Sequence, residues 1–294
     1  MAPIERSELA KDVTPKSLKT TPPQHSDAII LSYPVPHVML VTLNRPKARN
    51  AISAEMKMDV TRVFDWFENE PDLWVAIITG NGPAFCAGAD LKVWKEQNAT
   101  DPGRGVQDAL QSKSGFAGLS RRVSSKTLIA AVNGLSMGGG TEMVVNMDIV
   151  IASEKATFAL PEPRVGVFAL QGAIPRLVKF AGHQKAAEML LTTAEVSAKE
   201  AHDRFGFVNE VVPHAELIPR AIEWAKRVTA LSPDSIRATK RAMNEANAIG
   251  SLEDAWRSAL IAPESYNVYL GDNIKEGLRA FSERRKPQWS NPKL

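Results

Sequence analysis

Short, almost wholly apolar runs recur along the first two thirds of the chain, and turn residues close them. Val38–Leu43 runs into Asn44-Arg-Pro46, and Trp74–Thr79 runs into Gly80-Asn-Gly-Pro83. Three further runs of this kind are Leu128–Val132, Asp148–Ala152 and Thr157–Leu160. Apolar runs of this length that lack polar alternation are typical of strands buried on both faces of a sheet.

Segments with helical spacing lie between these runs. Ser53 is a candidate N-cap, and the apolar residues after it recur every three or four positions, at Met56, Val60, Val63, Phe64 and Phe67. Gly138-Gly-Gly140 opens a second helix that continues through Met147. Alternating strands and helices predict parallel pairing with right-handed crossovers, so the fold class is α/β.

The pattern changes at about Pro213, after which no strand-like run occurs. Residues 215–230 and 235–260 have helical periodicity. We therefore expect three parts: a mobile N-terminal arm over residues 1–26, a strand-and-helix core over 27–212, and a helical C-terminal region over 213–294.

Composition narrows the functional class of this 294-residue chain. No apolar run approaches the ~18 residues of a membrane span. The net charge of +3 gives no reason to expect nucleic-acid binding. The five histidines and the single cysteine, Cys86, form no metal-ligand cluster in the sequence, so we expect no metal.

The two ends of the chain bear on its location. Residues 1–26 hold acidic side chains and lack an apolar core segment, which argues against a secretory signal or a transit peptide. Pro292-Lys293-Leu294 resembles a peroxisomal Ser-Lys-Leu address, which an import receptor reads. We expect a peroxisomal location, and otherwise a cytoplasmic one.

Two small-residue segments can present backbone donors to a ligand. In Ala84–Lys92, the residues Ala87, Gly88 and Ala89 allow close approach to the backbone. Gly138-Gly-Gly140 leaves the N–H groups of a helix start open. Two such donors aimed at one oxygen form an oxyanion hole. Neither Ser-x-x-Lys nor Gly-x-Ser-x-Gly occurs, so enolate stabilisation with proton transfer is expected rather than acyl transfer.

Two glutamates could transfer the proton. Glu142 lies in the first turn of the glycine-started helix, and Glu162 lies in the rigid turn Leu160-Pro-Glu-Pro163. Each position also has an ordinary structural explanation, as compensation of a helix dipole or as a solvated loop residue. The residues alone therefore leave the catalytic role open.

Six motifs occur together in the order and spacing of the crotonase (enoyl-CoA hydratase/isomerase) superfamily, which the chain resembles from about residue 27 to 287. They are Asn44-Arg-Pro46, Phe85–Asp90, Ala131–Gly134, Gly138–Gly140, Asp148, and Phe158 with Pro161-Glu162. The resemblance implies a ββα spiral core with an α-helical C-terminal oligomerisation region, assembled as a homo-trimer or hexamer.

The same resemblance implies roles for particular residues. Ala89 and Gly139 match the two backbone donors to the thioester oxygen, and Lys92 matches a position that contacts coenzyme A. Glu142 and Glu162 match the paired carboxylates of true hydratases. We expect an enoyl-CoA hydratase that needs no cofactor, because coenzyme A is part of its acyl-CoA substrate. Its expected substrate-binding residues are Ala87, Asp90, Leu91, Lys92, Phe168 and Leu170.

One segment departs from the family pattern. Val165–Gly172 replaces the usual glycine-rich stretch, and Leu170 stands where a glycine often lines the acyl pocket. This puts a short linear enoyl chain in question as the natural substrate. The rival functions are double-bond isomerisation by Glu162 alone and a non-catalytic RNA-binding role. The near-neutral charge and the intact glutamate pair weigh against the second.

Overall fold

Two β-sheets form the body of the protein, which a computed structural model describes for residues 15–90, 101 and 103–293. The larger sheet has six strands in the order β1 (Ile29–Val35), β2 (Val38–Leu43), β3 (Val75–Gly80), β5 (Thr127–Val132), β7 (Ile149–Ser153) and β10 (Glu210–Val212). All neighbours pair in parallel except β1 and β2.

A smaller sheet collects the short strands that follow. Its order is β4 (Ala84–Cys86), β6 (Leu135–Met137), β8 (Thr157–Ala159) and β9 (Val196–Ser197). The chain thus places β3, β5 and β7 in the large sheet and β4, β6 and β8 directly after them in the small one. This repeated step is the ββα spiral expected from the sequence, and the α/β fold class is confirmed.

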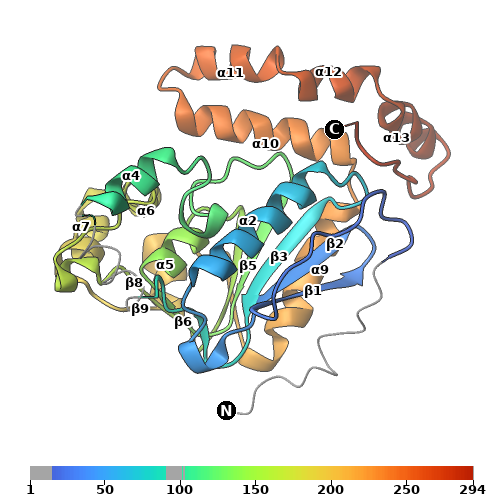
Figure 1. Cartoon of the computed structure of the whole chain (residues 1–294). Helices are drawn as coiled ribbons and strands as arrows, with labels where there is room; N and C mark the ends of the chain where they lie inside the picture. Colours follow the sequence, from blue (N-terminus) through green and yellow to red (C-terminus); the bar gives the residue numbers. More distant parts are fainter. Residues whose placement is uncertain (1–14, 91–100, 102, 294) are drawn as a thin grey trace.

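Helices cover both faces of the large sheet (Figure 1). Met39 and Val41 pack into the cluster that contains the apolar face of α2 (Ala54–Asn69). Val38 and Leu40, which alternate with them, pack against α9 (Leu217–Thr229). This double burial explains why β2 is apolar at nearly every position. Ser53 caps α2 as expected, since its side chain accepts the N–H of Met56.

The remaining helices complete the body and its extension. Those of the body are α4 (Arg104–Gln111), α5 (Gly139–Val144), α6 (Ala173–Ala181), α7 (His183–Thr192) and α8 (Ala198–Glu200), with short turns at η1 (Pro46–Ala48), η2 (Phe116–Gly118), η3 (Glu162–Val165), η4 (Ala201–Phe205) and η5 (His214–Glu216). The extension contains α10 (Pro233–Ala248), α11 (Leu252–Leu260), α12 (Pro263–Leu270) and α13 (Asp272–Ser282). Of the helices in the described part of the chain, none is long and apolar enough to cross a membrane.

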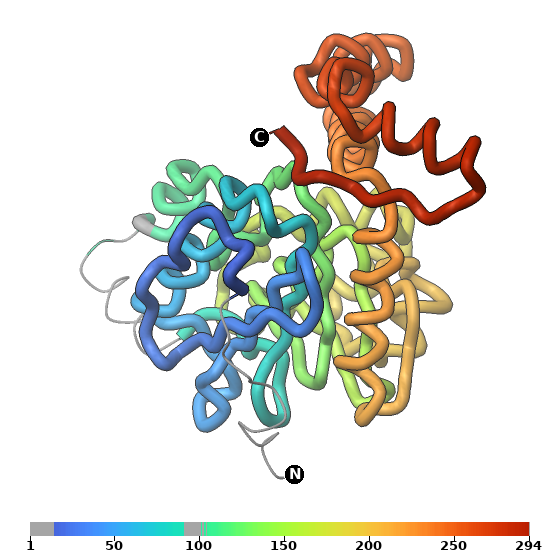
Figure 2. The backbone as a smooth tube through the Cα atoms, turned by 90° about the vertical axis from the view of Figure 1, so that its right-hand side faces the viewer, coloured from blue at the N-terminus to red at the C-terminus, as the bar shows by residue number. Residues whose placement is uncertain are grey.

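The extension projects from one end of the α/β body (Figures 1 and 2). Lys240 of α10 anchors it, because its Nζ donates to Asp148 Oδ2 at 2.7 Å and to the carbonyl of Lys126. The earlier helix α9, which also follows Pro213, packs on the sheet instead. The division at residue 213 therefore stays a prediction about the chain, and the change in packing falls between α9 and α10.

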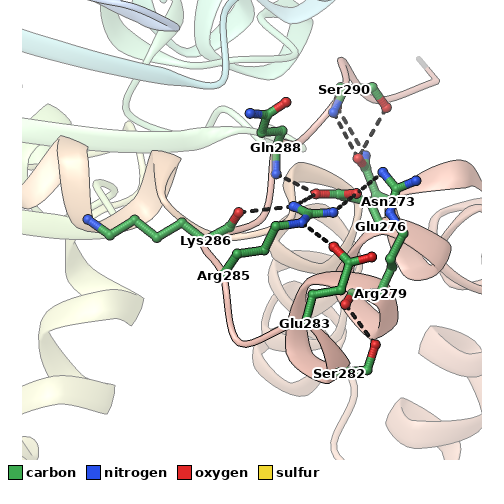
Figure 3. Close-up of polar contacts among 9 residues, drawn as sticks. All are labelled: Asn273, Glu276, Arg279, Ser282, Glu283, Arg285, Lys286, Gln288 and Ser290. Carbon is green, nitrogen blue, oxygen red and sulfur yellow. Dashed lines mark hydrogen bonds and ion pairs between the residues drawn. The ribbon is translucent and has the colours of Figure 1, made fainter.

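The last residues of the chain fold back onto the extension and the body. Glu276 accepts hydrogen bonds from Arg279, Arg285 and the N–H of Gln288, while Asn273 accepts one from the N–H of Ser290 (Figure 3). Beyond this network, Trp74 Nε1 donates to Asn291 at 3.2 Å and Arg237 Nη1 donates to the carbonyl of Lys293 at 2.6 Å. Pro292 is buried.

Residues near the N-terminus are also tied to the body. Ser17 Oγ donates to Asp72 at 2.6 Å, and the N–H of Thr20 donates to Glu70 at 2.7 Å. The expected mobile arm of residues 1–26 thus has fixed contacts in its second half, which its sequence did not indicate. Residues 1–14 lie outside the described part.

Candidate active site

Three connections between the sheets and their helices meet beside the small sheet. Residues 87–90 follow β4, Gly138 leads from β6 into α5, and Glu162 follows β8. Because β4, β6 and β8 are parallel neighbours, the segments that follow them leave the same edge of the sheet. The spiral therefore gathers the two small-residue segments and Glu162 at one place.

The two segments with candidate backbone donors lie against each other. Gly88 has φ +92°, and a β-carbon on it would lie 2.9 Å from the carbonyl oxygen of Met137 and 3.6 Å from the nitrogen of Gly139. Only glycine fits this conformation and this spacing. Within the described residues, no protein acceptor engages the N–H of Ala89 or of Gly139. Both N–H groups are therefore free of an acceptor from that part of the chain.

The start of α5 is closely packed by its neighbours. A β-carbon on Gly139 would lie 2.6 Å from the ring of Phe116, and one on Gly140 would lie 2.4 Å from the carbonyl oxygen of Cys86. Gly138 has φ +53°, and its N–H donates to the carbonyl of Ala159 at 2.9 Å. The three glycines thus let α5 begin in direct contact with β4, β8 and η2.

Glu142 lies in the first turn of α5, with 3% of its surface exposed. Its Oε1 accepts the N–H of Gln171 at 2.8 Å and the N–H of Ala173 at 3.3 Å. These donors lie at the start of α6, so the carboxylate of Glu142, which belongs to α5, caps the neighbouring helix. The side chain is therefore held in one orientation by backbone groups.

Glu162 opens η3 directly after the turn at Pro161. Its Oε1 lies 3.0 Å from the point where a β-carbon on Gly138 would stand, so the carboxylate approaches the start of α5 closely. Its Oε2 is buried and has no hydrogen-bond partner in the described part of the chain. A buried carboxylate oxygen without a partner is uncommon and indicates a group that a ligand engages.

The environment makes both carboxyl groups hard to ionise. Burial raises the pKa of Glu142 to about 7, and the nearby charge of Glu162 adds to the rise, while the N–H groups of Ala173 and Gln171 and the charge of Arg121 oppose it. Burial raises the pKa of Glu162 as well. Two interacting carboxyls of this kind can share one proton, so one can donate while the other accepts.

The single cysteine offers no nucleophile at this site. Cys86 is buried on β4, and burial raises the pKa of its thiol to about 12. The reactive form of a cysteine is the thiolate, which is scarce at that pKa. Proton transfer by the glutamates thus remains the chemistry that the arrangement supports.

The other expected site residues have varied placements. The N–H of Ala87 donates to the carbonyl of Arg49, and the carboxylate of Asp90 pairs with Arg45 at 3.3 Å. Phe168 is 59% exposed and so is not a core residue, while Leu170 is half-buried. Leu91 and Lys92 lie outside the described residues. Substrate contact by these six residues stays a prediction.

Sequence reasoning missed three residues that the structure places beside the glutamates. Gln171 positions Glu142 through its N–H, Phe116 contacts the start of α5, and Arg121 lies close enough to lower the pKa of Glu142. Gly172, which precedes α6 with φ +113°, was the available signal for Gln171, because a glycine before a helix marks a sharp turn. No comparable signal marks Phe116 or Arg121.

Comparison with known proteins adds to this geometry. The sequence model described as enoyl-CoA hydratase/isomerase matches residues 36–292. The mevalonyl-coenzyme A hydratase of Aspergillus fumigatus is 47% identical over 265 residues, which cover 90% of this chain and 96% of that protein. The enzyme of the same name from Beauveria bassiana is 41% identical, with 93% and 98% covered.

A solved structure has the same architecture. The crystal structure of an enoyl-CoA hydratase from Mycobacterium tuberculosis superimposes with a TM-score of 0.79. It is 31% identical in sequence, and the match covers 90% of this chain and 99% of that one.

Proposed function

The chain belongs to the enoyl-CoA hydratase/isomerase family, and from that premise we propose that it hydrates and dehydrates a branched acyl-CoA thioester of the mevalonyl type through Glu142 and Glu162. Hydro-lyase activity on CoA thioesters accords with the hydratases among its relatives. The two carboxyls that the fold brings to the start of α5, with Glu142 in its first turn and Glu162 against Gly138, are the observation that carries the mechanism, and burial raises the pKa of both.

The proposed reaction begins with polarisation of the substrate. The thioester carbonyl accepts hydrogen bonds from the N–H groups of Ala89 and Gly139, which draws electron density away from the 2,3 double bond. Backbone donors that are already oriented stabilise the developing enolate oxygen without reorganisation during the reaction. The close approach of Gly88 to Gly139 supports this role.

The proton transfers divide between the glutamates. The step starts from the form of the pair in which the shared proton lies on Glu162: Glu142 removes a proton from water as the water oxygen bonds to C3, and Glu162 delivers its proton to C2. The pair then holds one proton in total, as it did before the step, and exchange between the two carboxyls restores the starting form. Coenzyme A leaves with the product as part of the thioester, so this step uses no separate cofactor.

The substrate class rests on the relatives and on one local departure. Two proteins named as mevalonyl-CoA hydratases match nine tenths of the chain. Leu170 and Gln171 stand in the stretch that is glycine-rich in typical hydratases, and the N–H of Gln171 donates to Glu142. A changed wall beside the reacting carbon is what a branched substrate requires.

A panel of enoyl-CoA thioesters tests this proposal. The test compares the linear crotonyl-CoA with the enoyl thioester that dehydration of mevalonyl-CoA yields, and follows loss of the conjugated-thioester absorbance with mass spectrometry of the product. We expect a higher kcat/KM for the branched thioester and a product that has gained one water. Turnover of crotonyl-CoA alone would overturn the substrate class and leave the hydratase activity standing.

The assembly is part of the same proposal. The family resemblance implies a trimer, alone or paired into a hexamer, and the projecting helices α11 to α13 support an oligomer because they expose large apolar side chains. These are Leu252, Trp256, Leu260, Ile261, Tyr266, Tyr269, Leu270, Leu278 and Phe281. A face of this kind on a water-soluble enzyme is commonly covered by a protein partner. A second copy of this chain is the occupant we propose.

A peroxisomal location is the last part of the proposal. It rests on the resemblance of Pro292-Lys293-Leu294 to a receptor-read address. Because Pro292 is buried and the carbonyl of Lys293 accepts a hydrogen bond from Arg237, a receptor would have to release both from the body. N-terminal fluorescent fusions with and without the tripeptide test it: we expect punctate signal only from the first. Diffuse signal from both would contradict it.

A further inference from the structure

Two buried polar atoms beside Glu142 have no hydrogen-bond partner among the residues that the structure describes. These are Nε of Arg121 and Oε1 of Gln171. Burying a donor or an acceptor without a partner costs free energy, and most such groups in native proteins are paired. Unpaired polar atoms next to an active site therefore indicate a ligand group that completes them.

Both residues belong to the same wall of the site. The N–H of Gln171 donates to Glu142 Oε1 at 2.8 Å, and its carbonyl accepts from Oγ of Ser120, the neighbour of Arg121, at 2.7 Å. A β-carbon on Gly172 would lie 2.8 Å from Cγ of Arg121. The Arg121 side chain therefore runs directly past the residue that follows Gln171.

The far end of Arg121 is already engaged. Its Nη2 donates to the carbonyls of Ala109 and Ser112 at the end of α4. These bonds fix the guanidinium, so Nε is held in place as an oriented donor. Arg176 is a second guanidinium in this region: burial lowers its pKa, and the charge of Arg121 is close enough to lower it further.

The chemistry of the two atoms selects the ligand group. Nε–H can only donate, and Oε1 can only accept. A hydroxyl is the simple group that both accepts and donates. A methyl group does neither, a carboxylate cannot donate, and the charges of Arg121 and Arg176 disfavour a cationic tail.

We propose that Arg121 and Gln171 bind a hydroxyl group at the end of the acyl chain and so determine the substrate. This inference rests on the proposed function, because a mevalonyl chain carries a hydroxyl on C5, two carbons beyond the reacting C3. The hydroxyl accepts from Nε of Arg121 and donates to Oε1 of Gln171. Neither residue takes part in the proton transfers.

The experiment compares three branched enoyl thioesters that differ only at C5. One carries the hydroxyl, one lacks it, and one carries a carboxylate in its place. We expect wild-type kcat/KM to favour the hydroxyl thioester over the other two by ~10- to 100-fold, because a site built around a hydroxyl leaves its polar atoms unpaired with the analogues. A preference for the carboxylate or for the deoxy chain would overturn the inference.

The variant Gln171→Leu tests whether Gln171 is responsible for the preference for the hydroxyl thioester. Gln184→Leu, at an exposed position of α7, is its matched control. We expect Gln171→Leu to reduce the ratio of kcat/KM for the hydroxyl thioester over kcat/KM for the deoxy thioester to within ~3-fold, because the change removes one acceptor. An unchanged preference, or an equal loss on both thioesters in a folded protein, would contradict the assignment. If the variant does not fold, the wild-type ranking still decides the inference.

The proposed function fails in a different way. Wild-type enzyme that turns over none of the branched thioesters but hydrates crotonyl-CoA would remove the mevalonyl-type substrate class. Wild-type enzyme that accepts branched thioesters without regard to C5 would remove only the hydroxyl subsite.

Discussion

Glu142 is a buried carboxylate, and its ionisation in the folded state is unfavourable in free energy. Two backbone N–H groups at the start of α6 stabilise its charge, but burial and the charge of Glu162 outweigh them and raise its pKa to about 7. A group of this kind lowers folding stability as the pH rises from its unfolded-state pKa towards its folded-state pKa. Active sites commonly retain such groups because a carboxyl that titrates near neutral pH can both donate and accept protons.

Replacing Glu142 by glutamine should therefore stabilise the protein in a pH-dependent way. Below pH 4.5 the carboxyl is protonated in the folded and unfolded states, so the variant and wild type should be alike. Between pH 4.5 and 7 the carboxyl of residue 142 ionises only in the unfolded state, so the stability of the wild type falls as the pH rises. Above pH 7 the variant should be more stable by on the order of 3 kcal/mol.

Urea unfolding of both proteins from pH 4 to 9 measures this difference. Glutamine keeps an oxygen to accept the N–H groups of Gln171 and Ala173, so capping of α6 is preserved. Glu154→Gln at an exposed position is the control for loss of a carboxylate in general. A stability difference that stays constant across the range would show that Glu142 is not held neutral by its surroundings.

Among the secondary-structure elements, the start of α5 does the most to shape the site. Gly139 occupies the first helical position, where the N–H has no partner within the helix. Proline is tolerated at this position of a helix and removes that N–H. Its ring would clash with Phe116, which leaves only 2.6 Å for a β-carbon.

The oxyanion hole is best tested in a background that removes this clash. Relative to Phe116→Ala, the double variant Phe116→Ala/Gly139→Pro should lose about 3 kcal/mol of transition-state stabilisation, or ~10²-fold in turnover, because one of two donors is gone. Circular dichroism checks that α5 still forms, and Ala89→Gly, which keeps its N–H, is the mild control. Full activity in a folded double variant would place the thioester carbonyl elsewhere.

The elements that could be predicted from the sequence are those with a strong pattern. The runs that form β2, β3, β5 and β7 were long, apolar and closed by turns, and α2 had both a cap and a periodic face. The strands β4, β6 and β9 have two or three residues, which is too short for any periodicity. In β1, Tyr33 and Pro34 interrupt the apolar pattern, and in β10 burial is only partial.

The helical C-terminal region was also predicted, with one difference in its course. Periodicity over residues 235–260 suggested continuous helix, but α10 ends at Ala248 and α11 begins at Leu252. Gly250, followed by Ser251 as N-cap of α11, separates the two helices. The placement of Arg121 and Gln171 could not be predicted, because it depends on contacts between segments 50 residues apart in the sequence.

The whole molecule combines a packed body with an extension that is apolar on its surface. Lys240, Arg237 and the returning C-terminal segment fasten the base of the extension to the body. The outer helices carry large apolar side chains that the other described residues leave uncovered: Phe281 is 86% exposed and Leu252 is 85% exposed. The contrast between a packed body and an exposed apolar extension is what we expect if the extension packs against other copies of the chain.

Light scattering after size-exclusion chromatography measures the assembly. We expect three or six times the chain mass of 32.1 kDa at micromolar concentration. Trp256→Glu, which places a charge on the exposed face of α11, should shift the mass towards the monomer, while Glu253→Gln on the same helix should not. A wild-type monomer at micromolar concentration would contradict the trimer.

The central claim is that Glu142 and Glu162 together hydrate the thioester. Steady-state kinetics of wild type, Glu142→Gln and Glu162→Gln with the branched 5-hydroxy enoyl thioester tests it most directly. Each single variant should lose ~10²–10⁴-fold in turnover, the usual contribution of general acid–base catalysis, with native circular dichroism. A loss confined to Glu162→Gln, with an isomerised product that has gained no water, would favour single-carboxylate isomerisation. Near-wild-type hydration by both variants would contradict the account.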